Sequence, residues 1–220
     1  MRRVLRDNGL SLTMFGLFII FLIGQSVAGW KEYNADRRTH GQYVVEFWPY
    51  LTTGHFAEAV FENWESEFLQ MAGYVFLTVF LFQRGSAESK DPDDLDEEAA
   101  DKQVKRQPAD APWPLHRGGL ALKFYSHSLS LALTALFVLS LVGHALGGVK
   151  EYNEEQVQHG QPAVSLADYL TSSRFWFESL QNWQSEFLAV GVLVVLSIWL
   201  RERGSPESKP LTAPHEETGK

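Results

Sequence analysis

Two stretches of the chain carry no charged side chain, and they constrain the fold more than any other feature. Residues 10–30 and 128–149 contain no Asp, Glu, Lys or Arg. A helix needs about 20 apolar residues to cross roughly 30 Å of hydrocarbon, and both stretches are long enough. They exclude a soluble enzyme as the default interpretation, although 45% hydrophobic and 21% charged residues would suit one. The absence of cysteine excludes disulfides, thiolate metal sites and cysteine nucleophiles.

The chain is also a tandem duplication. Residues 31–90 align with residues 150–209 at a constant offset of 119, without a gap and with 27 identities in 60 positions. The identical pieces include Lys31–Asn34 with Lys150–Asn153, His40–Gln42 with His159–Gln161, and Arg84–Ser86 with Arg203–Ser205. Chance does not produce such agreement, so we expect the two copies to fold alike.

Each copy predicts a hairpin of two membrane-spanning helices. The first helices are predicted over Leu10–Ala28 and Leu129–Gly147, and the second contain Phe68–Gln83 and Phe187–Leu200. The uncharged second segments are too short for a full span, so each is expected to extend backwards into an amphipathic helix. These extensions are predicted to begin near Phe56 and Phe175. Leu10–Ala28 is interpreted as a permanent span, because its internal counterpart cannot be a secretion signal.

The basic residues orient the predicted hairpins. Thirteen Lys and Arg residues flank the helices on one side, against five in the two long loops at residues 29–62 and 148–181. The side richer in basic residues is expected to be cytoplasmic, which places both termini and the central linker there. The repeats are then parallel, and the two long loops are predicted to form folded caps on the outer side.

The predicted fold class is an all-α membrane protein, with four transmembrane helices arranged as two parallel-repeat hairpins with extracytoplasmic caps. Residues 85–117 carry a run of acidic side chains and several prolines, a composition typical of a disordered linker. The predicted domains are a first repeat at 1–84, the acidic linker at 85–117, a second repeat at 118–205 and a disordered tail at 206–220.

A polar group at the outer membrane edge is the candidate site. In each repeat an Asn, a Trp and a Glu share one helical face just before the second span. These residues are Asn63, Trp64 and Glu67, and Asn182, Trp183 and Glu186. One interpretation makes the two glutamates a pair that binds a cation or relays a proton. The favoured interpretation places them at the headgroups, beside Lys31 or Lys150, with the tryptophans in the aromatic belt.

Small residues in the first helices predict close helix packing. Gly24 and Ala28 align with Gly143 and Gly147 in a small-xxx-small pattern. His40 and His159 each precede a glycine and suggest a metal site, but one histidine per repeat matches no ligand motif. We favour structural histidines that form hydrogen bonds beside a turn.

Three segments carry a family resemblance: Arg2–Leu12, Glu62–Gln70 and Gln83–Lys90. There the chain resembles bacterial membrane proteins grouped as a domain of unknown function, number 6766. The resemblance covers nearly the whole chain except the linker and tail. It implies a bacterial cytoplasmic membrane protein, and it supplies no activity, cofactor or catalytic residue.

The function expected from the sequence is a non-enzymatic structural or partner-binding role in the membrane. No phosphate-binding loop, zincin motif or nucleophile elbow is present, and a net charge of -8 argues against nucleic acid. No cofactor or metal is expected. The lipid bilayer is the expected partner, and a homo-oligomer or a membrane-protein partner fits the small-residue faces. The alternative is a small proton or cation channel or transporter that uses Glu67 and Glu186.

Overall fold

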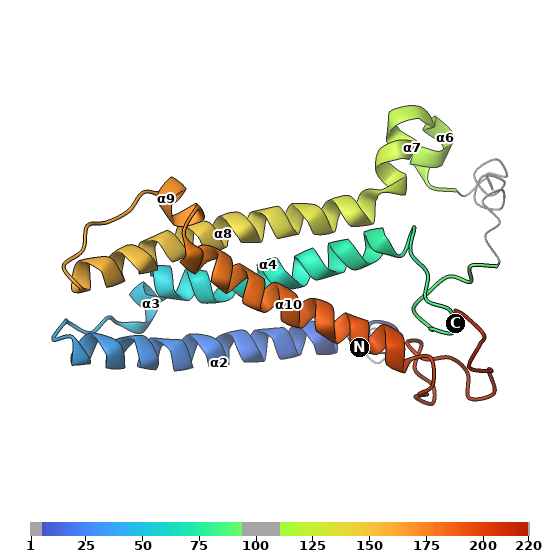
Figure 1. Cartoon of the computed structure of the whole chain (residues 1–220), viewed down its shortest axis with the longest axis horizontal. Helices are drawn as coiled ribbons and strands as arrows, with labels where there is room; N and C mark the ends of the chain where they lie inside the picture. Colours follow the sequence, from blue (N-terminus) through green and yellow to red (C-terminus); the bar gives the residue numbers. More distant parts are fainter. Residues whose placement is uncertain (1–5, 94–110, 220) are drawn as a thin grey trace. The chain divides into compact units, whose positions relative to one another are not determined.

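The computed structural model describes residues 6–93 and 111–219, and every regular element within these ranges is helical (Figure 1). The long helices are α2 (Gly9–Thr39), α4 (Gly54–Leu77), α8 (Ser128–Gln158) and α10 (Ser173–Leu196). The short ones are α3 (Phe47–Tyr50), α6 (Trp113–Arg117), α7 (Gly119–Ser126) and α9 (Leu166–Leu170). The all-α prediction is confirmed for the described residues. Most of the predicted linker, residues 94–110, lies outside them.

The helix bounds follow the offset seen in the sequence. Helices α8 and α10 begin and end 119 residues after α2 and α4. The prediction of a continuous helix beginning near Phe56 and Phe175 is confirmed, because α4 starts at Gly54 and α10 at Ser173.

The first helices are longer than predicted, because the charged segment after each apolar stretch stays helical. Both end at a glycine with a left-handed backbone, Gly41 at φ +67° and Gly160 at φ +69°. Beyond Gly41, the N–H of Gln42 donates to the carbonyl of Arg37 at 2.8 Å, and the Gln161 N–H makes the same bond. This pattern satisfies carbonyls that the helix end leaves open, so the glycine and not the charge sets the helix end.

The second helices are shorter at their C-terminal ends than predicted. They stop at Leu77 and Leu196, and tighter turns follow, such as the bond from the Phe80 N–H to the Leu77 carbonyl at 3.0 Å. At this point the hydroxyls of Thr78 and Ser197 donate to carbonyls three residues earlier, at 3.1 and 3.0 Å. Such hydroxyl bonds compete with the regular helical ladder, which explains the early end.

The chain divides into two compact units that do not coincide with the two repeats. Unit 1 comprises Met1–Glu62 and Leu141–Trp176, and unit 2 comprises Asn63–Ser140 and Phe177–Lys220. Each unit therefore takes segments from both repeats.

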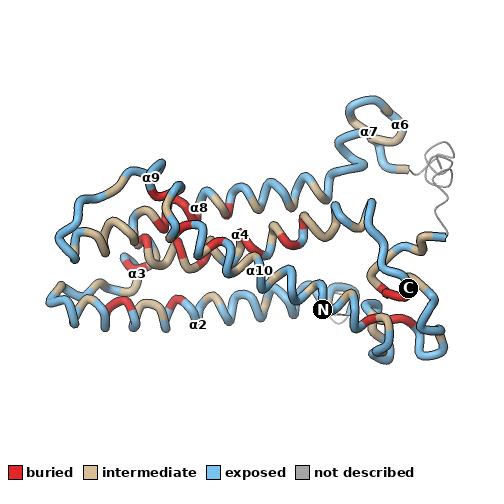
Figure 2. The backbone as a smooth tube through the Cα atoms, viewed as in Figure 1, coloured by how far each residue is buried: buried red, intermediate tan, exposed pale blue. Residues whose placement is uncertain are grey.

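Helices α2 and α8 are long and apolar enough to cross a membrane, by length and composition. Only 6% of the apolar window of α2 and 17% of that of α8 is buried. Figure 2 colours most residues in the first half of α2 as exposed. The core helix of a soluble protein would be mostly buried, so the exposure favours membrane association.

The segment after each first helix is fixed by one asparagine. In α2 the amide of Asn34 donates to the Val45 carbonyl at 2.8 Å and accepts the Val45 N–H at 2.7 Å. In α8 Asn153 makes the same two bonds to Val164, at 3.0 and 2.7 Å. The pairs lie 119 residues apart, so each repeat ties its returning chain to its first helix in the same way.

Asn34→Ala and Asn153→Ala are each expected to destabilise the protein by about 1–3 kcal/mol, because the valine N–H loses its acceptor and the valine carbonyl loses the amide donor. The Val45 carbonyl keeps the indole N–H of Trp30 as a donor, at 2.7 Å. Thermal unfolding in detergent, with proteolysis of residues 41–46 or 160–165, measures the effect. Asn→Asp is the comparison: aspartate still accepts the N–H but no longer donates, so it should cost less than alanine. Equal stability of both alanine variants and the wild type would contradict this account.

The C-terminal tail contacts the loop after α4 within unit 2. Lys209 is 2% exposed, and its ammonium lies within hydrogen-bond distance of four carbonyls, among them those of Gly85 at 2.6 Å and Glu217 at 2.8 Å. The Ser86 and Ser197 hydroxyls lie 2.9 Å apart beside it in unit 2. A buried ammonium needs such acceptors, and the tail supplies three of the four.

Candidate functional site

The buried carboxylate of unit 2 is Glu65, on α4. Its side chain is fully buried, at 0% exposure, and its Oε1 accepts the indole N–H of Trp183 on α10 at 2.8 Å. The Trp183 ring also meets Phe137 of α8 edge-on, with 6.2 Å between ring centroids. One glutamate thus joins α4 of the first repeat to α10 of the second.

Three of the six predicted edge residues, Trp183, Glu67 and Glu186, have neighbours that connect the two repeats. Glu67 and Glu186 are close enough for their charges to interact, as the paired interpretation requires, although the Glu67 side chain is exposed and Glu186 half-buried. Trp183 meets Glu65 and not the glutamate of its own repeat. The other three differ in exposure: Asn63 is exposed, and Trp64 and Asn182 are half-buried.

Glu65 was missed because the second repeat has Gln184 at its position. The comparison of the repeats therefore pointed to Glu67, which has an equivalent in Glu186. A signal was nevertheless present in α4: Glu58, Glu65 and Ala72 follow at steps of seven, and all three are buried. Heptad spacing places them on one face of the helix.

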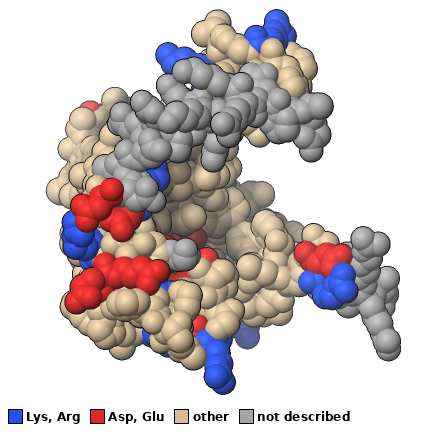
Figure 3. Space-filling model, turned by 90° about the vertical axis from the view of Figure 1, so that its right-hand side faces the viewer, with Lys and Arg blue, Asp and Glu red and all other residues tan. Residues whose placement is uncertain are grey.

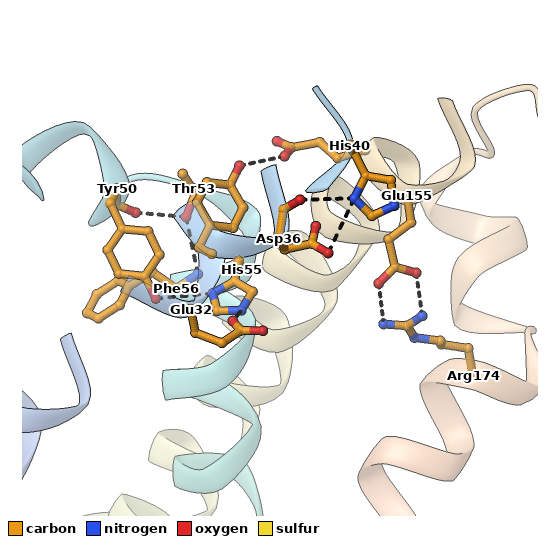
Figure 4. A network of polar contacts seen from close by, with 11 residues as sticks. Glu32, Asp36, His40, Tyr50, Thr53, His55, Phe56, Glu155 and Arg174 are labelled. Carbon is orange, nitrogen blue, oxygen red and sulfur yellow. Dashed lines mark hydrogen bonds and ion pairs between the residues drawn. The ribbon is translucent and has the colours of Figure 1, made fainter. Parts of the chain in front are cut away.

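In unit 1, polar side chains from several helices form a network that Figure 4 shows from close by. His55, in α4, pairs through Nε2 with Glu32 of α2 at 3.1 Å and through Nδ1 with the Tyr50 hydroxyl at 3.1 Å. The equivalent of His55 in the second repeat is Arg174, which donates two hydrogen bonds to Glu155, at 2.6 and 3.1 Å. Each repeat thus holds a basic side chain of its second helix against a carboxylate of its first.

The network also contains a side-chain hydrogen bond between the two repeats. The Tyr33 hydroxyl of α2 donates to Glu154 of α8 at 2.8 Å, and the Arg37 guanidinium lies 5.5 Å over the Tyr33 ring. Burial, together with the charges of Glu32 and Glu151, raises the pKa of the Tyr50 hydroxyl to about 12. Tyr50 therefore stays a neutral hydrogen-bonding group over the physiological range.

Unit 1 also contains a perturbed carboxyl group, that of Glu151. It lies two residues beyond the uncharged stretch of α8, outside the predicted span. Burial, followed by the charges of Glu154 and Glu155, raises its pKa from 4.5 to about 7, against the opposing effects of the His55 backbone N–H and of Arg174. Its Oε2 is buried and has no hydrogen-bond partner in the described structure. This carboxyl group therefore changes charge near neutral pH.

The two histidines that suggested a metal have structural roles. The ring Nδ1 of His40 donates to the Asp36 carbonyl at 3.0 Å, and that of His159 to the Glu155 carbonyl at 2.8 Å. Both residues stand immediately before the left-handed glycines that end α2 and α8. The interpretation as hydrogen-bonding histidines beside a turn is confirmed. Their rings also meet each other, with 6.5 Å between centroids.

The four predicted packing residues fall into two environments. A Cβ on Gly147 would lie 2.6 Å from the Glu58 nitrogen, and one on Gly143 would lie 2.5 Å from the Phe61 ring, so α8 closely approaches α4 at both glycines. A Cβ on Gly24 would meet nothing within 4 Å, and Ala28 is exposed. Within unit 1, the small-xxx-small pattern therefore makes a helix contact in the second repeat and not in the first.

The buried polar residues nearest this contact are Glu58 and His144. Glu58 accepts a hydrogen bond from the Tyr169 hydroxyl at 3.4 Å, and a ligand atom of His144 lies within 4.8 Å of its carboxylate. Both residues are of types that bind metals.

Taken together, these helices define the class of the chain: an all-helical protein with two mostly exposed apolar helices suited to a membrane. The chain belongs to the family described as Domain of unknown function (DUF6766), whose family model matches residues 1–220. The resemblance carried by the three sequence segments is thereby confirmed. No curated protein and no solved structure matches the chain.

Proposed function

We propose that the chain is an integral protein of the bacterial cytoplasmic membrane with a non-enzymatic structural or partner-binding role. Two observations support the membrane location. The apolar side chains of α2 and α8 are exposed, and polar side chains such as those of Glu65 and His144 are buried. In water this distribution would be unfavourable, whereas in lipid it is the expected one.

The proposed topology has four spans with both termini in the cytoplasm. Helices α4 and α10 have 24 residues each, about 36 Å at the helical rise, which is enough to cross the hydrocarbon with some tilt. The excess of Lys and Arg at the termini and linker sets the orientation. Because the chain has no cysteine, single-cysteine variants labelled from either side of intact cells test the topology directly.

The observation that supports a structural role is the set of contacts between the two repeats in unit 1. The Tyr33 to Glu154 hydrogen bond and the glycine contacts of Gly143 and Gly147 hold first-repeat and second-repeat helices against each other. A rigid pair of caps presents a fixed surface, which suits a scaffold or a docking platform for another membrane protein. A second copy of the chain is the simplest such partner.

The second candidate is proton or cation passage, which the electrostatic interaction between the Glu67 and Glu186 carboxylates favours, because two like charges attract a proton or a cation between them. Ionisable side chains inside a bundle of spans mark ion or proton paths more often than structural positions. Glu65 joins this candidate site because it is fully buried and bound to the opposite repeat through Trp183.

Flux measurements in liposomes separate the two candidates. The purified protein is reconstituted, and proton and monovalent-cation flux is followed for the wild type, for Glu67→Gln with Glu186→Gln, and for Glu65→Gln. Glu46→Gln, at an exposed acidic position of the cap, is the control. The structural role predicts no flux above empty liposomes. Flux that both glutamine variants abolish and the control retains would replace it with conduction.

A further inference from the structure

The short helices α6 and α7 form a segment whose large apolar side chains are exposed and whose charged side chains are all basic. Neither helix contributes a buried residue. Four large side chains are exposed: Trp113 at 61%, Leu120 at 73%, Phe124 at 64% and Tyr125 at 44%. Helices with this much open apolar surface are unstable in water alone, so something is expected to cover them.

The two most exposed apolar side chains of α7, Leu120 and Phe124, lie on one side of the helix. Leu120 and Phe124 are four residues apart and therefore adjacent on the helical surface, while Lys123 borders them. Trp113 lies in α6, and the Arg117 guanidinium is 5.1 Å from its ring centroid. The result is an apolar strip edged by basic groups, the pattern of a helix that lies in a membrane interface.

The charge of this segment is opposite to that of the chain as a whole. Residues 111–149 contain Arg117 and Lys123 and no Asp or Glu, whereas the whole chain has a net charge of -8. Figure 3 shows blue basic atoms and no red ones on the segment at the top, which carries α6 and α7. A basic surface with exposed aromatic rings is complementary to anionic lipid headgroups.

The position of α7 in the chain is the second argument for lipid. It ends at Ser126, and α8, one of the two helices suited to a membrane, begins at Ser128. Gly118 and Gly119 have left-handed backbones at φ +63° and +56°, which separates α7 from α6 as a short helix of its own. A helix two residues from the end of a span lies at the headgroup level by chain geometry alone.

We propose that α6 and α7 dock on the anionic surface of the cytoplasmic leaflet, with Trp113, Leu120 and Phe124 inserted and Arg117 and Lys123 on the phosphates. The proposal rests on the membrane insertion of α8 proposed above. It assigns these helices a lipid-binding role that is separate from Glu67, Glu186 and the caps.

The test uses the cysteine-free full-length chain with one nitroxide label at a time, at Leu120→Cys, Phe124→Cys, Ser126→Cys and Leu139→Cys. Leu139, in α8, is 66% exposed and reports on the insertion of that helix independently of α7. The protein is reconstituted in vesicles of phosphatidylcholine alone or mixed with phosphatidylglycerol. Collisions of the label with oxygen, which enters lipid, and with a water-soluble nickel chelate give the depth of each position.

In anionic vesicles the labels at Leu120 and Phe124 are expected to be reached by oxygen and protected from nickel, while Ser126 is reached by nickel. Arg117→Gln with Lys123→Gln should shift the docked population about 30-fold towards the undocked state, roughly fivefold for each basic residue. High salt should weaken docking in the same direction.

Three results would overturn the proposal. If Leu139 is in lipid but all α7 labels are open to nickel, the docking is wrong and the membrane insertion stands. If Leu139 is also open to nickel, both are wrong. If the α7 labels are shielded from oxygen and nickel alike, a protein surface and not lipid covers the helix.

Discussion

Gly147→Ala is expected to lower the melting temperature by roughly 3–10 °C, whereas Gly24→Ala is expected to raise it slightly. At Gly147 the new methyl group would lie 2.6 Å from the backbone nitrogen of Glu58 and 3.0 Å from Ala57. Backbone atoms of a packed helix cannot move aside cheaply, so the expected cost is about 1–3 kcal/mol.

Gly24 provides the matched control because it has the same residue type on the equivalent helix of the first repeat. Nothing lies within 4 Å of a Cβ there, so alanine brings only its better helix propensity, worth up to about 1 kcal/mol. The natural chain already has Ala28 at the position equivalent to Gly147. Thermal unfolding in detergent measures both variants, and a Gly147→Ala protein as stable as the wild type would show that α4 and α8 are not in close contact.

Glu151→Gln is expected to remove a fall in stability that the wild type shows as the pH rises from about 4.5 to 7. The folded-state pKa of Glu151 is raised from 4.5 to about 7 by burial and the neighbouring glutamates. An acid with a raised pKa binds its proton more tightly in the folded state. The folded protein is therefore most stable where Glu151 is protonated and loses stability as the pH passes through this window.

The size of the loss follows from the two pKa values. A pKa difference of about 2.5, at about 1.4 kcal/mol for each pKa unit, gives an upper limit between about 3 and 4 kcal/mol. Tryptophan fluorescence during heating, at a series of pH values, measures it. Glu32→Gln is the control, because this equivalent residue of the first repeat is 69% exposed and should leave the fall in place. A Glu151→Gln protein with the wild-type pH profile would contradict the assignment.

The sequence allowed the helices to be predicted better than their contacts. The uncharged stretches locate the apolar parts of α2 and α8, because they depend on local composition alone. The offset of 119 relates each helix of the first repeat to its equivalent in the second. The continuation of α2 to Thr39 could not be predicted from hydropathy, because a charged, solvated helix and a charged loop have similar compositions. The left-handed Gly41 that ends it was the informative residue.

The candidate site shows where sequence reasoning stops. Asn63 and Glu67 share a helical face by spacing alone, and that much is local. The contact of Trp183 with Glu65 depends on which helices pack together, which local spacing does not reveal. A comparison of the repeats also discards Glu65, because Gln184 replaces it in the second repeat. Gly24 and Gly143 likewise have the same local pattern but different neighbours.

The mixing of both repeats in unit 1 has a consequence for biosynthesis. The Tyr33 hydroxyl binds Glu154, which lies 121 positions later in the chain, and unit 1 extends to Trp176. The ribosome must therefore translate the chain as far as Trp176 before this unit can close. Contacts so distant in sequence are slow to form and leave incomplete intermediates exposed. The nascent first repeat therefore lacks these contacts until the second repeat has been translated. The length of the segment between them sets the length of that delay.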